Sequence, residues 1–122
     1  MANPFLEGTF PEQGTILENA HCVFVMTPQP VFPGSGLIVT KEIRETVFNL
    51  TPEEWTATFE LLREAKLYLD DFRPDGYNIG WNVRPVGGQS VPHVHLHVIP
   101  RNDGPRAGKG VRYYLQPENR RS

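Results

Sequence analysis

Three of the four histidines in this chain stand at every second position of one short stretch, His93-Val94-His95-Leu96-His97. Alternation with a period of two is typical of a β-strand with two different faces. We therefore expect Val94 and Leu96 to face the core while the three imidazoles share the other face. Residues i and i+2 on a strand lie about 6.6–7 Å apart, so neighbouring rings can act on one small group. Because a neutral imidazole is a nucleophile or base near pH 7, the pattern predicts that kind of chemistry.

A metal site is the main alternative, because His-x-His is a common spacing for metal ligands. A closed site needs a fourth ligand, and His21 and Cys22 are the remaining candidates. They are adjacent to each other on what reads as a different strand. A solvated surface strand is a further alternative, but three histidines in register opposite an apolar face argue against it. We expect no metal or other cofactor, and the metal site stays open as the minority hypothesis.

The sequence Gly-Gly-Gln-Ser at residues 87–90 precedes the histidines, and Pro100-Arg101 follows them. This arrangement resembles the signature of the histidine triad (HIT) family of nucleotide hydrolases and transferases, most closely its fragile-histidine-triad-like and bacterial branches. Upstream, the resemblance includes residues 30–34 and Leu50-Thr51-Pro52. It covers most of the chain from about residue 15 onward, and the core motif is long and specific.

The resemblance implies a reaction and three histidine roles. His95 would be the nucleophile that attacks an α-phosphorus, giving a nucleotidyl-histidine that water then cleaves. His97 would contact the phosphate or the leaving group, and His93 would orient the nucleophile. The implied substrates are purine nucleotide conjugates, either dinucleoside polyphosphates or nucleoside phosphoramidates. A nucleotide-binding regulatory module with incidental slow hydrolysis and a His-based metalloenzyme remain as alternatives.

The glycine-rich connection before the histidine strand is expected to hold phosphoryl oxygens. Glycines let the main chain approach a ligand closely, so main-chain N–H groups and the Ser90 hydroxyl can donate hydrogen bonds to it. The candidate residues here are Gly88, Gln89, Ser90 and Val91. The resemblance also places Asn82 where the family has an amide side chain on the α-phosphate.

Two further candidates depart from the pattern of the family. Thr27 occupies the ribose-contacting position, where aspartate or asparagine is more usual. Ser35 follows Pro33-Gly34, where the family commonly has another histidine. We expect Ser35 to bind substrate and to hydrogen-bond to His93. Without this fourth imidazole ring, we expect the reaction rate and proton transfer to differ from the family's, whereas the identity of the nucleophile should not.

Length and composition predict a single domain spanning residues 1–122. The chain has 122 residues and 39% hydrophobic residues, enough for one core. Its single cysteine, Cys22, allows no intrachain disulfide and reads as a buried core residue, which favours a reducing cytoplasm. The start of the chain lacks the features of a signal peptide. The longest apolar run, residues 22–26, is far too short to span a membrane.

Charge is distributed unevenly along the chain, although the net charge is only −2. Residues 1–100 are acidic, whereas the segment 101–122 holds six basic side chains against Asp103 and Glu118. A basic segment directly after the histidine strand suits an anionic substrate, although it would also serve simply as a solvated tail. The basic residues are not interleaved with exposed aromatics, so we expect no nucleic-acid partner.

The order of the predicted elements indicates an α+β, HIT-like fold, with an antiparallel sheet of about five strands, one long helix and one short helix. An irregular arm is expected over residues 1–15 and a loop over 27–36. Strands are expected at 16–19, 22–26, 36–40, 77–83 and 92–100, with a further short strand possible at 111–115. The short helix is expected within residues 41–50, and the long helix follows it.

The long helix carries a clear start signal. Thr51 suits the N-cap, Pro52 the first helical position, and Glu54 completes a capping box, with Leu50 and Trp55 placed as a hydrophobic staple. An apolar stripe at helical spacing is expected to face the core, and its members are Trp55, Phe59, Leu62, Leu69 and Phe72.

We also expect a homodimer. A small sheet with modest apolar content has an edge to protect, and the resembling family pairs two protomers into one continuous sheet. Trp55 with other residues of the long helix, or residues 77–81, are the expected contact.

Overall fold

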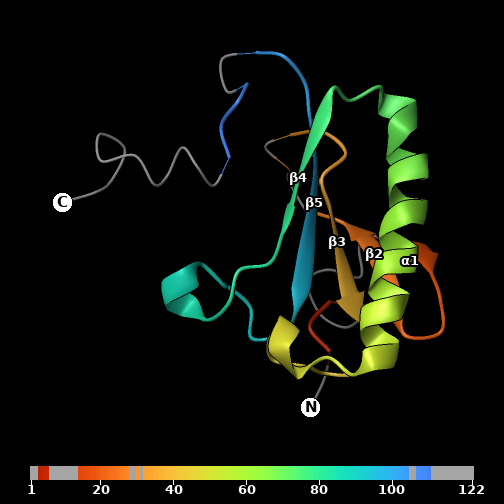
Figure 1. Cartoon of the computed structure of the whole chain (residues 1–122), viewed down its shortest axis with the longest axis vertical. Coiled ribbons are helices and arrows are strands. Elements are labelled where there is room, and N and C mark those ends of the chain that lie inside the picture. Colours follow the sequence, from red (N-terminus) through yellow and green to blue (C-terminus); the bar gives the residue numbers. More distant parts are fainter. Residues whose placement is uncertain (1–2, 6–13, 28–29, 31, 105–106, 111–122) are drawn as a thin grey trace.

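The computed structural model describes residues 3–5, 14–27, 30, 32–104 and 107–110. Its centre is an antiparallel sheet of five strands in the order β1-β2-β3-β5-β4 (Figure 1). The strands are β1 (Thr15–Glu18), β2 (Cys22–Met26), β3 (Gly36–Thr40), β4 (Gly76–Gly80) and β5 (His95–Arg101). Helix α1 (Pro52–Leu69) lies against one face of the sheet. The predicted α+β class, with about five strands and one long helix, is therefore confirmed.

The register of the sheet positions the histidine strand between two neighbours. On one side of β5, Val39 pairs with His95 and Leu37 with His97. On the other side, Gly80 of β4 pairs with His97. β4 is the edge strand on this side of the sheet, and β1 forms the other edge. His97 is thus flanked by two strands, so its position is set by hydrogen-bonded neighbours on both sides.

Strand β5 begins later than the alternation predicts. The predicted span was 92–100, whereas the strand runs from His95 to Arg101. Proline at position 92 has no N–H for a ladder, and the N–H of Val94 donates to the Arg44 carbonyl outside the sheet at 2.7 Å. His93 therefore precedes the strand proper. β4 likewise ends at Gly80 rather than at residue 83.

The predicted capping box at the start of helix α1 is present in both directions. The Thr51 hydroxyl accepts from the Glu54 N–H at 3.1 Å, and the Glu54 carboxylate accepts from the Thr51 N–H at 2.8 Å. After α1 the chain continues as a 3₁₀ turn, η3 (Asp70–Phe72). The predicted short helix within 41–50 is reduced to the 3₁₀ turn η2 (Val47–Asn49), whose N-cap is Thr46.

The prediction of which residues of the long helix face the core is largely wrong. Trp55, Phe59 and Phe72 are 45%, 60% and 52% exposed. The face that packs on the sheet follows a spacing of four residues instead, through Ala57, Leu61, Ala65 and Leu69. Two alanines in this row let the helix lie close to the strands, and bulky aromatic rings do not fit there. Only Leu69 of the predicted stripe is fully buried, with Leu62 partly buried against the core.

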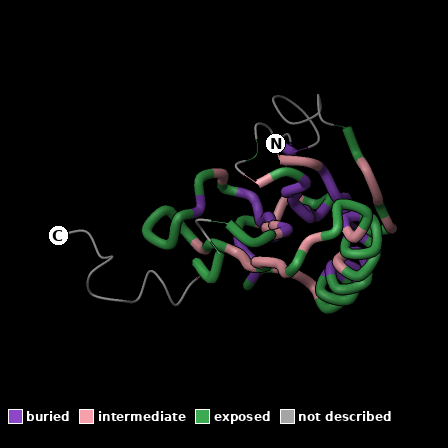
Figure 2. The backbone as a smooth tube through the Cα atoms, turned by 90° about the horizontal axis from the view of Figure 1, so that it is seen from above, coloured by how far each residue is buried: buried purple, intermediate pink, exposed green. Residues whose placement is uncertain are grey.

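Two apolar clusters cover the two faces of the sheet. The larger lies between the sheet and α1, and it includes Cys22, Phe24, Ile38 and Leu96, so the prediction that Cys22 is a core residue is confirmed. The second cluster lies on the opposite face and consists of Phe5, Val23, Val25, Leu37 and Val39. Figure 2 shows buried strand residues gathered beside the helix, whose outer side is exposed.

Within the described part of the chain, no helix is long and apolar enough to cross a membrane. A third 3₁₀ turn, η4 (Pro85–Gly87), projects from the connection between β4 and β5 (Figure 1). The possible strand at 111–115 and most of the arm 1–15 lie outside the described residues. Of the basic segment 101–122, the structure describes residues 101–104 and 107–110.

Candidate active site

The predicted alternation of the histidine stretch is confirmed. Val94, Leu96 and Val98 are buried, and the latter two belong to the cluster under α1. His95 and His97 lie on the other face of β5, with their ring centroids 5.0 Å apart in an edge-to-face arrangement. The imidazoles of His95 and His97 therefore lie on the sheet face away from the helix, and His93, just before the strand, shares with His95 a contact to Phe5.

Both ring nitrogens of His93 are engaged. The Arg44 main-chain N–H donates to Nδ1 at 3.2 Å, so Nδ1 is an acceptor. Nε2 lies 3.0 Å from the Thr40 carbonyl, which accepts only, so Nε2 carries the proton. His93 is completely buried. It is a neutral ring with a fixed tautomer, and neither nitrogen points to a substrate.

His95 has the opposite tautomer. Its Nδ1 lies 2.7 Å from the His93 carbonyl oxygen, and since a carbonyl only accepts, Nδ1 carries the proton. Nε2 therefore keeps its lone pair. The His95 side chain is only 5% exposed, so the surrounding protein restricts its orientation. This arrangement presents one unprotonated nitrogen in a fixed direction.

His97 is less buried than the other two rings, and its Nε2 is a buried atom with no hydrogen-bond partner among the residues that the structure describes. A buried polar atom without a partner is costly, which is typical of a site that a ligand completes.

Burial lowers the pKa of His93, His95 and His97 below the usual value for histidine, and the neighbouring His95 lowers that of His97 further. All three rings are neutral near pH 7.

The lowered pKa of His95 predicts how kcat/KM depends on pH. Attack by His95 needs the unprotonated ring, and burial lowers the pKa of His95. The ring therefore protonates only below the usual histidine value of about 6.5, and kcat/KM should stay level from neutral pH down through that value and then fall. A pH profile with a neutral leaving group measures this, and an acid limb centred above about 7 would contradict it.

Phe5 covers the histidines from the second apolar cluster. Its ring centroid lies 5.0 Å from that of His95 and 5.7 Å from that of His93, and the side chain is buried. Asn3 anchors this segment, because its amide donates to the Thr40 and Lys41 carbonyls at 2.9 and 3.0 Å. Sequence reasoning missed Phe5 because it lies in an arm rich in proline and glycine. Its one available signal was its aromatic side chain, and Phe10 of the same arm gives the same signal.

Arg44 is a second residue that sequence reasoning missed. Its main chain holds His93 and Val94, and its guanidinium Nε donates to both carboxylate oxygens of Glu54 at 2.9 and 3.1 Å. Glu54 is 2% exposed, and its hydrogen bonds with Thr51 and Arg44 lower its pKa despite the opposing effect of burial. The start of α1 is thus joined to the segment that orients His93.

The glycine-rich connection uses most of its predicted donors internally. The N–H groups of Gly87 and Gln89 donate to the Arg84 carbonyl, and that of Gly88 donates to Pro85. Gly88 has a φ of 99°, a conformation that favours glycine. Neither the N–H nor the hydroxyl of Ser90 donates to another described residue. Of the main-chain donors expected at residues 87–90, Ser90 is therefore the one left for a ligand.

The Gln89 side chain does not face a ligand, because it holds its own loop together. Its oxygen accepts from the Arg84 N–H at 2.7 Å, and its amide nitrogen donates to the Glu45 and Val91 carbonyls at 2.7 and 3.0 Å. Val91 is partly buried against the second apolar cluster. Gln89 and Val91 thus shape the loop that precedes the histidines.

Asn82 lies beside this loop on the exposed side. Its amide nitrogen is 3.4 Å from the Gly88 carbonyl oxygen, and a Cβ built on Gly88 would lie 3.4 Å from the Asn82 side chain. The absence of a side chain at Gly88 therefore leaves room for Asn82. Asn82 and His97 both line a pocket of about 730 Å³.

Thr27 and Ser35 line the same pocket and are joined by a main-chain hydrogen bond of 2.9 Å. The predicted contact between Ser35 and His93 is wrong. The Ser35 hydroxyl donates to the Phe32 carbonyl at 2.6 Å, whereas both nitrogens of His93 are engaged elsewhere. Register explains the separation, because the next residue, Gly36, pairs with Val98, beyond His97 on β5.

The structure separates the candidate residues into two groups. The pocket is lined by four of them, which are Thr27, Ser35, Asn82 and His97. The others are not among the described residues that line it, and these are Gly88, Gln89, Ser90, Val91, His93 and His95. The proposed extra metal ligands are not part of either group. Cys22 faces α1 and contacts the Thr58 hydroxyl at 3.5 Å, and His21 is exposed at the β1–β2 turn.

The fold and the histidine strand together define a protein with the HIT-like architecture. The HIT domain family model matches residues 11–104, so the chain belongs to the HIT family. A solved HIT family protein from Bacillus anthracis is 27% identical, with a TM-score of 0.69, and the match covers 86% of this chain and 78% of that one.

Two relatives show the range of this similarity. The bis(5'-nucleosyl)-tetraphosphatase [asymmetrical] of Schizosaccharomyces pombe is 35% identical over 60% of this chain, and the match spans 41% of that relative. An uncharacterized HIT-like protein of Mycoplasma genitalium, MG132, is 30% identical over 86% of this chain and 73% of its own length. The chain thus spans less than half of the first relative and most of the second.

Proposed function

We propose that this chain is a nucleotidyl hydrolase or transferase that works through a nucleotidyl-His95 intermediate. The observation that carries the proposal is the hydrogen bond from His95 Nδ1 to the His93 carbonyl at 2.7 Å. It assigns the proton to Nδ1 and the lone pair to Nε2. Since burial also keeps the ring neutral, His95 has the form that a nucleophile at phosphorus requires.

The reaction would proceed in two steps. In the first, the Nε2 lone pair of His95 forms a bond to the α-phosphorus, and the bond from phosphorus to the leaving group breaks with its electron pair. In the second, water attacks the same phosphorus and gives up a proton to solvent, and the electron pair of the N–P bond returns to Nε2. Another nucleophile in place of water would make the reaction a transfer.

The other candidate residues have roles that fit this geometry. His97 Nε2 would contact a phosphoryl oxygen or the leaving group, which would give that buried nitrogen a partner. Ser90 and Asn82 would donate to phosphoryl oxygens. Thr27 would contact the ribose from the pocket wall. His93 would act through its carbonyl, as a positioning residue rather than as a group that touches substrate.

We propose that the substrate is a dinucleoside polyphosphate, one of the two classes that the resemblance to the family implies. The S. pombe relative is named as a bis(5'-nucleosyl)-tetraphosphatase, which supports a dinucleoside polyphosphate substrate for this chain. Nucleoside phosphoramidates would undergo the same first step, with an amine leaving that needs a proton. A phosphate leaving group departs as an oxyanion and needs none. The neutral state of His97 favours the leaving group that needs no proton.

The purified protein should release a mononucleotide from a fluorogenic adenylyl substrate, and a chelator should leave the rate unchanged. Both nitrogens of His93 are engaged by Arg44 and Thr40, so the triad offers a metal ion few ligands. Metal analysis before and after chelation is the matched control. Stoichiometric zinc with activity lost on its removal would favour a metalloenzyme, and binding without turnover would favour a regulatory module.

We also propose that two copies pair along the β4 edge and the adjoining side of α1. Trp55 of the helix packs edge-to-face on Trp81 next to β4, at 5.6 Å between ring centroids. Trp55, Phe59 and Ile79 are all exposed on or beside this edge. Exposed aromatic residues next to an unpaired strand are typical of an interface. Light scattering at micromolar concentration should give twice the chain mass, and a monomer would contradict the proposal.

A further inference from the structure

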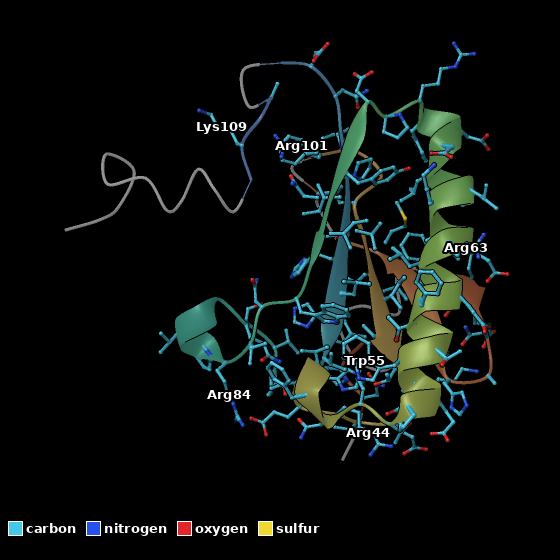
Figure 3. All side chains as sticks on the ribbon, viewed as in Figure 1. Arg44, Trp55, Arg63, Arg84, Arg101 and Lys109 are labelled. Atoms are coloured by element: carbon cyan, nitrogen blue, oxygen red, sulfur yellow. The ribbon has the colours of Figure 1, made fainter. Side chains whose placement is uncertain are left out.

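A partly buried ion pair joins helix α1 to the segment that contacts His93. Arg44 Nε donates to both carboxylate oxygens of Glu54, at 2.9 and 3.1 Å. Glu54 is buried and the Arg44 side chain is 32% exposed, so salt and water screen this pair less than an exposed pair. In Figure 3, Arg44 lies at the end of the sheet where α1 begins. The Arg44 side chain is thus anchored to the first turn of that helix.

The main chain of Arg44 makes two hydrogen bonds to consecutive residues of the histidine stretch. Its N–H donates to His93 Nδ1 at 3.2 Å, and its carbonyl accepts from the Val94 N–H at 2.7 Å. The Val94 N–H and the His93 carbonyl belong to one planar peptide group and point in opposite directions. The Arg44 carbonyl therefore fixes the plane of that group, and with it the direction of the His93 carbonyl.

The His93 carbonyl is the group that holds the proton on His95 Nδ1, at 2.7 Å. A neutral imidazole carries its one proton on either nitrogen, and the hydrogen bonds around it select which. If the peptide group after His93 rotated, this hydrogen bond would be lost and the proton would be free to occupy Nε2. Nε2 would then have no lone pair for attack at phosphorus. The contacts that begin at Glu54 and Arg44 therefore end at the tautomer of the proposed nucleophile.

We propose that Arg44 and Glu54 are positioning residues for the reaction, whose ion pair holds the peptide group after His93 so that His95 presents an unprotonated Nε2. The inference rests on the proposed function and adds two residues that act at a distance from the substrate. Neither is among the described residues that line the pocket. Loss of the ion pair should therefore lower kcat and leave the binding of a mononucleotide unchanged.

Glu54→Gln separates the ion pair from the cap of α1. Glutamine still accepts from the Thr51 N–H, as it does in other capping boxes, but it is neutral and offers Arg44 one acceptor oxygen instead of two. Arg44→Met removes the guanidinium and keeps the main-chain groups of residue 44. Each variant should lower kcat roughly tenfold to a hundredfold, the effect of a small misplacement of a reacting group. The double variant should lose no more than either single variant, because both remove the same interaction.

Glu18→Gln is the matched control. Glu18 pairs at 3.0 Å with Lys41, which lies in the same segment as Arg44, and both of these side chains are exposed. Breaking this pair should leave kcat unchanged. Equilibrium titration with AMP should give the same dissociation constant for all of the variants and for the unmodified protein.

NMR of the ring nitrogens provides a readout that a purely structural role would not change. In the unmodified protein the proton of His95 should be on Nδ1 and that of His93 on Nε2. In Glu54→Gln and in Arg44→Met, His95 should show a mixture of the two tautomers. The exposed His21 is the internal reference and should give the same signals in every variant.

A kcat that is unchanged in both single variants would overturn the positioning role and leave the proposed function intact. A lower kcat with the His95 proton still wholly on Nδ1 would overturn it as well, because the pair would then only stabilise the fold. If Glu54→Gln fails to fold, Arg44→Met gives the same test with the capping box in place. If the unmodified protein shows no turnover, the proposed function falls and the positioning role falls with it.

Discussion

His95→Ala is expected to lower kcat at least about a thousandfold, because removal of a nucleophile leaves only binding and electrostatic contributions to the reaction. Mononucleotide binding should remain, since Thr27, Asn82 and His97 still line the pocket. Single-turnover assays with a dinucleoside polyphosphate measure the loss, and equilibrium titration measures the binding.

The matched control for this variant is His21→Ala. His21 is exposed at the turn between β1 and β2, and its main-chain N–H contacts Asn19, so the same substitution there removes a ring that is not on β5. Its turnover should equal that of the unmodified protein. If His95→Ala kept activity within about tenfold of the unmodified protein, the assignment of the nucleophile would be wrong.

Leu61→Ala is expected to lower the free energy of unfolding by about 3 kcal/mol, since deletion of a buried leucine side chain leaves a cavity and typically costs about 2–5 kcal/mol. Leu61 is fully buried and belongs to the cluster between α1 and the sheet. Chemical denaturation followed by circular dichroism gives the value directly.

Leu67→Ala is the control on the same helix. Leu67 is 72% exposed, so its truncation should change the free energy of unfolding by less than about 0.5 kcal/mol. Both variants retain the helix propensity of alanine, and the comparison therefore isolates burial. Equal effects of the two substitutions would mean that α1 packs on the sheet through a different face.

Short sequence patterns predicted the strand and the helix start whose residues lie close together in the sequence. The alternation at His93–His97 predicted a strand with an apolar face, and the Thr51-Pro52-Glu54 cluster predicted both the start of α1 and its capping hydrogen bonds. These signals depend on residues close together in sequence. Helix α1 shows their limit, because the buried row is set by how closely the helix approaches the sheet, and the alanines at 57 and 65 allow that approach.

The parts of the site that sequence reasoning missed depend on contacts between distant segments. Phe5 reaches the histidines from the N-terminal arm, and Arg44 joins His93 to the start of α1. Ser35 was expected at His93, but strand register places it beyond His97, where it lines the pocket. The internal hydrogen bonds of residues 84–89 likewise depend on a loop conformation that composition does not specify.

A covalent adduct on His95 is the central claim, and rapid mixing with an α-labelled dinucleoside polyphosphate tests it most directly. Under single-turnover conditions, quenching in alkali should preserve an N–P bond, and peptide mapping should place the label on the fragment that contains His95. The label should be lost in acid, unlike an ester to Ser90, and should be absent from His95→Ala. Product formation without any adduct at any time would contradict the account, because water would then attack phosphorus directly.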